Sequence, residues 1–357
     1  MMRCVTVIGA RPQFIKAAPV GRALASVGIE EILVHTGQHY DSGMSDVFFS
    51  ELEIKPPTHH LGIGGGSHGA MTGRMLEAIE AVLVAENPDI LLVYGDTNST
   101  LAGALAAAKL HIPVAHVEAG LRSFNRAMPE EVNRVLTDHV SRWLLCPGEV
   151  AICNLLREGI TEGVLDVGDV MADAIKWASA RVGTKGFPIC LPGGISRNAF
   201  GLLTIHRQEN TEQRERLRTI LAGIEQSGHT MVFPVHPRTS KALKLLDLKL
   251  PANVHPIPPV SYLEMVALLD FCDVVATDSG GLQKEAYWMQ RPCVTLRQET
   301  EWSETLEHGW NRIVGADASL IADALAKPVK PSLHPPLYGD GNAAAKVAEA
   351  LVYRRIS

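Results

Sequence analysis

The sequence predicts an α/β protein built from two doubly wound, Rossmann-like domains, each with a parallel sheet. Three observations support this fold class: short apolar runs alternate with helical patterns, the alternation restarts near residue 201, and a Gly- and Pro-rich stretch at 181–198 separates the two sets. Strands that are apolar along their whole length are typical of a parallel sheet covered by helices on both faces. Strand–helix alternation of this kind indicates doubly wound domains.

The apolar runs define the expected elements in chain order. Strands are expected at 4–8, 31–35, 90–94, 114–117 and 143–146, with helices at roughly 13–26, 68–85, 99–109 and 129–139. The second set of strands is expected at 201–205, 230–235, 254–257, 274–276 and 294–296. We therefore predict a first domain at 1–175, a second at 176–340, and a C-terminal helix at 341–357 that packs back on the first. Ligands of open α/β sheets bind outside the carboxyl ends of the strands, so two such domains predict a cleft lined by those ends.

Composition excludes several classes of protein. The length of 357 residues suits about two domains, and the net charge of −6 argues against a general nucleic-acid binder. No apolar run approaches the ~20 residues that cross a bilayer, and the N-terminus lacks the pattern of a signal peptide. The six cysteines lack CxxC spacing, and no His/Cys cluster suggests zinc. We expect a cytoplasmic protein without a metal that binds neither nucleic acid nor membrane.

Carboxylates follow the strands of the first half. Asp96 follows the strand at 90–94, Glu118 ends the strand at 114–117, and Glu130 and Glu131 open the next helix. Each has a structural alternative, because Asp96 suits a helix cap and acids stabilise a helix N-terminus. Burial would raise the pKa of Glu118 unless Arg122 or Arg126 offsets it. Carboxylates in differing environments can supply one site with both an acid and a base.

The first βα turn, "GARPQFIKAAP", suits an anion. Arg11 and Lys16 flank the start of a helix, where backbone N–H groups and a cation favour a phosphate. A surface Arg and Lys on an ordinary turn is the alternative. The segment "LGIGGGSHG" follows no strand, so we predict a flexible lid or interface loop there rather than a phosphate loop.

The strand ends of the second half carry cations and glycines. "TIHRQEN" ends a strand on His206 and Arg207, and "PVHPR" follows another. In "TDSGGLQKEA", Ser279, Gly280 and Gly281 open a helix, where small residues let backbone N–H groups approach a phosphate. Glu285, one turn later, is placed to bond a ribose diol. We expect a nucleotide diphosphate on this half, with its reacting group against the acids of the other.

These motifs resemble those of the non-hydrolysing UDP-N-acetylglucosamine 2-epimerases, which have the two-domain GT-B architecture. The resemblance runs nearly end to end, through "GARPQFIKAAP", "TGQH", "YGDTNST", "PVAHVEAGLRS", "MPEEVNR", "TIHRQEN", "PVHPR", "TDSGGLQKEA" and "YGDGNAA". It implies interconversion of UDP-GlcNAc and UDP-ManNAc by elimination of UDP across C1–C2 and re-addition with C2 inverted. It also implies a homodimer without a cofactor, acting in the biosynthesis of cell-surface polysaccharides.

The resemblance assigns roles to individual residues. It implies acid/base work at the sugar for Asp96, Glu118 and Glu130, and a place for His206 beside the diphosphate. The implied UDP-binding residues are Arg11, Lys16, Arg207, Ser279, Gly280, Gly281 and Glu285. Bacterial members of the family can bind a second UDP-GlcNAc as an activator, and the matching segments contain Gln38, His39, Arg74 and His236.

Departures from the common pattern affect the expected substrate. "GARPQ" has Gln13 where an acid is usual, and "TEWSE" has Trp302 where an Arg is common. With "RSFNRAMPEE", these forms resemble the branch acting on UDP-2,3-diacetamido-2,3-dideoxyglucuronate, for which Arg126 is a candidate partner of the C6 carboxylate. A solvated loop Arg is the alternative. A GT-B glycosyltransferase and a nucleotide-sugar sensor are the competing functions, but neither requires three sugar-facing acids.

Overall fold

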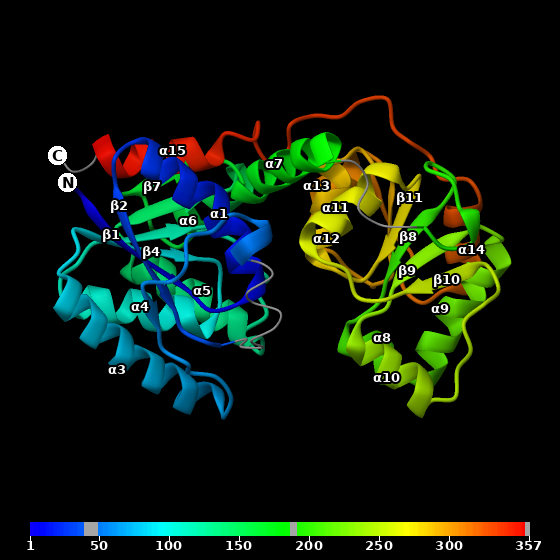
Figure 1. Cartoon of the computed structure of the whole chain (residues 1–357), viewed down its shortest axis with the longest axis horizontal. Helices are drawn as coiled ribbons and strands as arrows, with labels where there is room; N and C mark the ends of the chain where they lie inside the picture. Colours follow the sequence, from blue (N-terminus) through cyan, green and yellow to red (C-terminus); the bar gives the residue numbers. More distant parts are fainter. Residues whose placement is uncertain (39–48, 186–190, 354–357) are drawn as a thin grey trace. The chain divides into compact units, whose positions relative to one another are not determined.

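The structure is a computed structural model that describes residues 1–38, 49–185 and 191–353. The chain forms two compact units (Figure 1). Unit 1 comprises Met1–Lys176 with Pro336–Ser357, and unit 2 comprises Trp177–Pro335. Each unit has its own parallel sheet, as the fold class predicted from the sequence requires.

The sheet of unit 1 has seven strands in the order β3-β2-β1-β4-β5-β6-β7, and each neighbouring pair is parallel. The strands are β1 (Arg3–Ile8), β2 (Glu30–His35), β3 (His59–His60), β4 (Ile90–Tyr94), β5 (Val114–Val117), β6 (Trp143–Cys146) and β7 (Val164–Asp166). The central strands β1, β4, β5 and β6 are almost wholly buried, which explains their unbroken apolar sequences.

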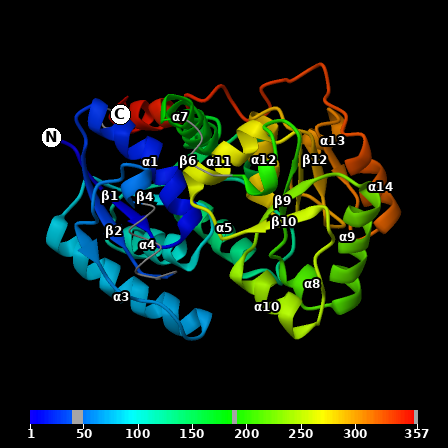
Figure 2. The ribbon, with the colours of Figure 1, turned by 45° about the vertical axis from the view of Figure 1, so that its right-hand side comes forward.

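Helices cover both faces of this sheet. They are α1 (Arg11–Ser26), α3 (His68–Glu86), α4 (Asn98–Lys109), α5 (Pro129–Val140), α6 (Glu149–Arg157), α7 (Val170–Lys185) and α15 (Ala343–Tyr353). α3, α4 and α5 pack side by side on one face, while α1 and α15 pack together on the other (Figure 2). One face of the core joins Val5 and Val7 of β1 to Met75 and Ile79 of α3.

The sheet of unit 2 has six parallel strands in the order β10-β9-β8-β11-β12-β13. The strands are β8 (Gly201–Thr204), β9 (Met231–Pro234), β10 (Val254–Ile257), β11 (Val274–Thr277), β12 (Cys293–Thr295) and β13 (Asn311–Ile313). The helices are α8 (Gln208–Thr211), α9 (Arg214–Ser227), α10 (Pro237–Leu245), α11 (Tyr262–Phe271), α12 (Gly280–Trp288), α13 (Ser303–Glu307) and α14 (Ala318–Ala326), with a 3₁₀ turn η1 (Pro192–Gly194).

Three strands were not predicted from the sequence, and all three lie at a sheet edge. β3, β7 and β13 are two or three residues long and are partly exposed. An edge strand is covered on fewer sides than a central one, so it needs no continuous apolar run. The missing signal therefore follows from their shortness together with their edge position, since β10, an edge strand of four residues, was predicted.

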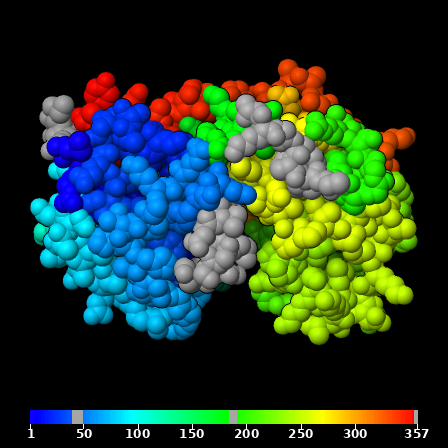
Figure 3. All heavy atoms as spheres, viewed as in Figure 1, coloured from blue at the N-terminus to red at the C-terminus, as the bar shows by residue number. Residues whose placement is uncertain are grey.

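The boundary between the units falls inside α7, and the chain returns to unit 1 at Pro336. The stretch proposed as a linker therefore begins in a helix, which continues to Lys185. On its return the chain is held to unit 1 by Asp173 of α7, whose carboxylate accepts the backbone N–H groups of Ala343 and Ala344 at 3.0 Å each. α15 then packs on α1, and the red C-terminal residues lie beside the blue N-terminal ones in the space-filling view (Figure 3).

Candidate active site

The candidates from the first half of the sequence lie at the carboxyl ends of the strands of the unit 1 sheet. β1, β4 and β5 are parallel neighbours, so the residues that follow them share the carboxyl edge. Arg11 opens α1 after β1, Asp96 follows β4, and Glu118 directly follows β5. Glu130 lies in the first turn of α5, a helix that packs against β5.

Glu118 forms an ion pair with the ammonium group of Lys16. Each side chain is only 13% exposed, so the pair is largely shielded from water. Burial opposes the charge of Lys16, but the carboxylates of Glu118, Asp169 and Asp96 outweigh it and raise the lysine pKa. The cation paired with Glu118 is therefore Lys16, whereas only Arg122 and Arg126 were considered for this part from the sequence.

Asp96 is not the cap of the next helix. Thr97 caps α4, since its hydroxyl accepts the backbone N–H of Thr100 at 3.2 Å. The carboxylate of Asp96 instead forms an ion pair with Arg134 of α5, and Asn133 donates to the Asp96 carbonyl at 2.9 Å. Capping by Thr97 leaves the carboxylate of Asp96 available at the sheet edge.

The neighbouring acids Glu130 and Glu131 have different environments. Glu131 is buried and accepts hydrogen bonds from the backbone N–H of Ser123 at 2.8 Å and of Phe124 at 3.0 Å. It also pairs with Arg134 at 3.2 Å, so it fixes the loop before α5. Glu130 is exposed, and in the described part of the chain no residue bonds its side chain. Of the two, only Glu130 is available to a ligand.

Gln13 is a buried structural residue. Its carbonyl oxygen accepts the N–H groups of Gly9 at 2.8 Å and Ala10 at 3.0 Å, and its amide donates to the carbonyl of Tyr94 at 2.9 Å. A carboxylate could accept the first two bonds but could not donate the third. Gln13 is 1% exposed, so its difference from the common acid does not act on a substrate directly. Arg11, two residues earlier, is partly exposed at the helix start.

Arg122 and Arg126 also differ in burial: Arg122 is buried and paired with acids, and Arg126 is exposed. Arg122 donates to Asp138 at 2.7 Å and to both carboxylate oxygens of Glu158 at 2.7 Å each, and its side chain is 1% exposed. It is therefore not free to bind a substrate. Arg126 lies in the exposed part of the same loop.

In unit 2, Asp278 holds the turn that carries His206 and Arg207. Its buried carboxylate accepts the backbone N–H groups of His206 at 3.0 Å and Arg207 at 2.9 Å, and the side-chain amide of Asn210 at 3.0 Å. The imidazole of His206 is 36% exposed. Burial lowers the pKa of His206, Arg207 and Arg238 lower it further, and Asp278 opposes them.

The predicted phosphate loop is the start of α12. Ser279 caps this helix by accepting the N–H of Leu282 at 3.4 Å, and Gly280 and Gly281 form its first turn. The first N–H groups of a helix lack partners within the helix and attract anions. A Cβ atom at Gly280 would lie 3.3 Å from a carboxylate oxygen of Glu301, a tight contact that this side chain would have to relieve by a small shift.

Trp302 and Glu285 lie close to this helix start. The indole N–H of Trp302 donates to the carbonyl of Gly280 at 2.9 Å, and the ammonium group of Lys284 lies 4.0 Å from the centre of a Trp302 ring. Glu285 is 7% exposed. Burial raises the pKa of its carboxyl group to about 8, against the opposing charge of Lys284.

The candidates for a second ligand site are distributed over both units. In unit 1, Gln38 accepts the backbone N–H of Ser99 at 3.0 Å, and Arg74 donates to the carbonyl of Gly65 at 2.8 Å. In unit 2, His236 caps α10. His39 lies outside the described residues.

Several residues of the candidate site were not identified from the sequence. Arg134 and Asn133 pair with Asp96, and Asp278 positions His206. Their spacing offered a signal for α5, because Glu130, Asn133 and Arg134 share one helix face at i, i+3 and i+4. In residues 1–38, 49–185 and 191–353, no group of three or more His, Cys, Asp or Glu side chains is arranged to hold a metal ion. None of the helices described there is long and apolar enough to cross a membrane.

Comparison with known proteins places this arrangement in a family. The family model described as UDP-N-acetylglucosamine 2-epimerase matches residues 22–352. A UDP-N-acetylglucosamine 2-epimerase homolog of Methanococcus maripaludis is 50% identical over 98% of this chain and 99% of its own. The UDP-2,3-diacetamido-2,3-dideoxy-D-glucuronate 2-epimerase of Pseudomonas aeruginosa is 48% identical over 98% and 99% of the two chains.

A solved structure extends the similarity to the fold. It is the Methanocaldococcus jannaschii UDP-GlcNAc 2-epimerase in complex with UDP-GlcNAc and UDP, which is 41% identical and superposes with a TM-score of 0.86. The match covers 99% of this chain and 100% of that one. With the two parallel-sheet units, this similarity confirms the predicted GT-B fold class. By sequence, by fold and by the motifs at its strand ends, the chain belongs to the UDP-N-acetylglucosamine 2-epimerase family.

Proposed function

We propose that this protein is a non-hydrolysing UDP-N-acetylglucosamine 2-epimerase that interconverts UDP-GlcNAc and UDP-ManNAc. The observation that carries the proposal is the set of carboxylates at the unit 1 sheet edge. Asp96 is paired with Arg134, Glu118 is paired with Lys16, and Glu130 is exposed. The three carboxylates therefore differ in their partners and in their exposure to solvent, and carboxylates in differing environments can supply one site with both an acid and a base.

The proposed reaction has two balanced steps. In elimination, a carboxylate takes the proton from C2, and the bond between C1 and the phosphate oxygen breaks, leaving 2-acetamidoglucal and UDP. In re-addition, the phosphate oxygen attacks C1 and an acid delivers a proton to the opposite face of C2. Glu118 and Glu130 are the proposed proton carriers, and Asp96 completes the acidic site. Two separate carriers explain how the configuration at C2 can invert.

The proposed diphosphate site lies in unit 2. The first turn of α12, Ser279 to Gly281, supplies backbone N–H groups, and His206 and Arg207 supply the side-chain donors. Donors of this kind stabilise the charge that develops on a departing diphosphate. Glu285 is the proposed ribose contact. Arg11, at the start of α1, is a further proposed UDP-binding residue. The reaction transfers no electrons overall, so the proposal includes no cofactor.

UDP-2,3-diacetamido-2,3-dideoxyglucuronate is the second candidate substrate. It is favoured by the 48% identity to the Pseudomonas aeruginosa enzyme named for that sugar and by the exposure of Arg126 in the loop before α5. A guanidinium can bond a C6 carboxylate in a bidentate manner, which it cannot do with a neutral hydroxymethyl group. Arg122 is excluded from this role because Asp138 and Glu158 already bind it.

Family membership also supports a homodimer in the cytoplasm that supplies a precursor for cell-surface polysaccharides. Gln38, Arg74 and His236, together with His39, are the proposed residues of an activating UDP-sugar site. Initial rates measured over a range of UDP-GlcNAc concentrations test that site, since activation gives a sigmoidal rather than hyperbolic curve.

The deciding experiment is incubation of the purified protein with UDP-GlcNAc alone, in D₂O and without NAD or an acceptor. We expect UDP-ManNAc with deuterium at C2, detected by ¹H NMR. A glycosyltransferase or a sensor would give no epimer, and retention of the original hydrogen at C2 would overturn elimination. A parallel incubation with the diacetamido-glucuronate nucleotide compares kcat/KM for the two sugars.

A further inference from the structure

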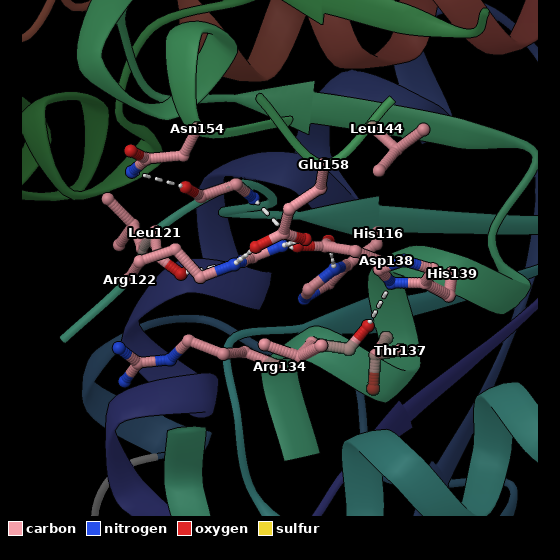
Figure 4. Close-up of polar contacts among 12 residues, drawn as sticks. His116, Leu121, Arg122, Arg134, Thr137, Asp138, His139, Leu144, Asn154 and Glu158 are labelled. Carbon is pink, nitrogen blue, oxygen red and sulfur yellow. Dashed lines mark hydrogen bonds and ion pairs between the residues drawn. The ribbon is translucent and has the colours of Figure 1, made fainter. Parts of the chain in front are cut away.

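Four side chains of unit 1, His116, Asp138, Arg122 and Glu158, form a chain of hydrogen bonds and ion pairs (Figure 4). His116 of β5 bonds Asp138 of α5 at 2.7 Å, Asp138 bonds Arg122 at 2.7 Å, and Arg122 bonds Glu158 at 2.7 Å. The side chains of His116 and Asp138 are 0% exposed and that of Arg122 is 1% exposed. Only Glu158, at the end of α6, reaches solvent.

The hydrogen bonds determine the charges in this chain. His116 has Nδ1 2.7 Å from a carboxylate oxygen of Asp138 and Nε2 2.7 Å from the carbonyl oxygen of Gly95. Both partners are acceptors, so the arrangement suits a ring that carries a proton on each nitrogen. Burial alone would raise the pKa of Asp138, but His116 and Arg122 outweigh burial and lower it. Positive and negative groups therefore alternate, which lets these charges remain buried.

The same groups hold the backbone on both sides of the acids. His116 donates to the carbonyl of Gly95, the residue before Asp96. Asp138 accepts the backbone N–H of Gly120 at 3.1 Å, two residues after Glu118. Arg122 donates to the carbonyl of Leu121 at 2.7 Å. One network thus forms hydrogen bonds with the backbone of both turns, the one that carries Asp96 and the one that carries Glu118.

The turn that carries Glu118 needs support because its backbone is strained. Glu118 has a φ of 72°, in the left-handed region that a residue with a side chain rarely adopts. Such a conformation costs about 1–3 kcal/mol and persists only where the surroundings enforce it. Gly120 has a φ of 80°, and a Cβ atom there would lie 2.4 Å from the carbonyl oxygen of Ala151. The bond from Gly120 to Asp138 acts beside those from the N–H groups of Glu118 and Ala119 to the carbonyl of Leu145. Its loss would weaken the hold on the strained conformation of Glu118.

We propose that His116 and Asp138 are positioning residues, which hold the carboxylates of Asp96 and Glu118 in place for proton transfer at C2. The inference rests on the proposed function, in which those two acids serve the sugar. Neither His116 nor Asp138 touches the substrate, because both are fully buried. Their effect is on the geometry of the acids, where a misplacement of about 1 Å can cost on the order of 10²-fold in rate.

The test compares Asp138→Asn with Glu86→Gln. Glu86 is also bound by one Arg and one His, Arg3 at 2.7 Å and His59 at 2.7 Å. Arg3 begins β1, so this pair lies at the amino ends of the strands, away from the carboxyl ends where the acids lie. We expect Asp138→Asn to lower kcat for UDP-GlcNAc roughly 10–100-fold, with KM within about threefold of wild type. Glu86→Gln should keep wild-type kcat and lose less thermal stability than Asp138→Asn, because the side chain of Glu86 is 21% exposed. Equal, near wild-type kcat in both variants would overturn the proposal and leave Asp138 a purely structural residue.

Two further measurements cover the case in which Asp138→Asn does not fold. Glu158→Gln changes only the solvent-facing end of the network and should lower kcat about 2–10-fold without a change in KM. ¹⁵N NMR of the wild-type protein, with His116 assigned by its loss in His116→Gln, should show protons on both ring nitrogens. A ring with one proton, or a Glu158→Gln variant with wild-type kcat, would count against the network.

Failure of the inference can be separated from failure of the proposed function. If Glu118→Gln abolishes epimerisation while Asp138→Asn keeps it, only the positioning role is wrong. If Glu118→Gln retains full turnover, the acids themselves are misassigned and the proposed function fails first.

Discussion

The ammonium group of Lys16, on the second turn of α1, lies against the carboxylate of Glu118 at the end of β5. The two residues are 102 positions apart in the sequence, and each side chain is only 13% exposed. A cation this close favours the charged form of a carboxylate that is shielded from water. A general base must be an ionised carboxylate, so the first prediction concerns Glu118.

Glu118→Gln should lower kcat roughly 10²–10⁴-fold, because the amide cannot accept the C2 proton. UDP affinity, measured by calorimetry, should stay near the wild-type value, since the proposed UDP site is in unit 2. Glu149→Gln is the matched control, because Glu149 is exposed in the first turn of α6, the helix that follows the neighbouring strand β6. Near wild-type turnover in Glu118→Gln would remove this residue from the mechanism.

Glu130→Gln should affect mainly kcat and Glu131→Gln mainly stability, although the two residues are adjacent. Glu130 is exposed, so its variant should lose kcat roughly 10²–10⁴-fold with unchanged thermal stability. Glu131 fixes the loop through Ser123 and Phe124, so its variant should lose about 1–3 kcal/mol of unfolding free energy. Urea unfolding and initial rates on both variants decide this, and loss of stability in Glu130→Gln would contradict the assignment.

His206→Ala should weaken UDP binding and slow elimination, because a donor to the diphosphate is lost. His229→Ala is the control: His229 is also partly buried in unit 2, where it pairs with Asp273 at 3.0 Å. Calorimetric titration with UDP should show weaker binding only in His206→Ala. Equal affinities in the two variants would place the diphosphate elsewhere.

Stability of the ligand-free protein should fall as pH rises from about 5 to about 8 through Glu285. Burial raises the pKa of this carboxyl from 4.5 to about 8, so in that window the folded protein holds a proton that the unfolded chain has released. The contribution to unfolding free energy is on the order of a few kcal/mol, at about 1.4 kcal/mol per pKa unit. Denaturant unfolding of wild type and Glu285→Gln at both pH limits should show a shallower decline in the variant. Identical declines would mean that Glu285 ionises normally.

The diacetamido-glucuronate nucleotide should have the higher kcat/KM of the two candidate sugars if Arg126 binds a C6 carboxylate. Arg126→Ala should then reduce the preference by about 1–3 kcal/mol, the cost of leaving a charged group unpaired. Arg157→Ala, another exposed arginine of unit 1, controls for the general effect of lost charge. An equal loss on both sugars in Arg126→Ala would show that Arg126 only balances nearby acids.

The central strands of both sheets could be predicted because a strand buried on both faces has an unbroken run of apolar residues. The run at 143–146 matches β6 residue for residue, and the predicted helices of unit 1 lie within two residues of α1, α3, α4 and α5 at either end. The edge strands β3, β7 and β13 have no such run, because they are short and partly exposed. Burial pattern therefore predicts the longer strands, the edge strand β10 at 254–257 among them, better than edge strands of two or three residues.

By itself, the sequence determined the fold class, the family and the chemical type of each strand end: acids after β4 and β5, and His, Arg and glycines after β8 and β11. Each of these features is local, a run of apolar residues followed by a few polar ones. Only the tertiary structure decided which of these groups pair with one another and which are buried. Lys16 binds Glu118, Arg134 binds Asp96, Asp138 and Glu158 bind Arg122, and Gln13 and Glu131 are buried supports. Such pairings depend on distances of a few ångströms between side chains from separate elements, and no pattern along the chain encodes those distances.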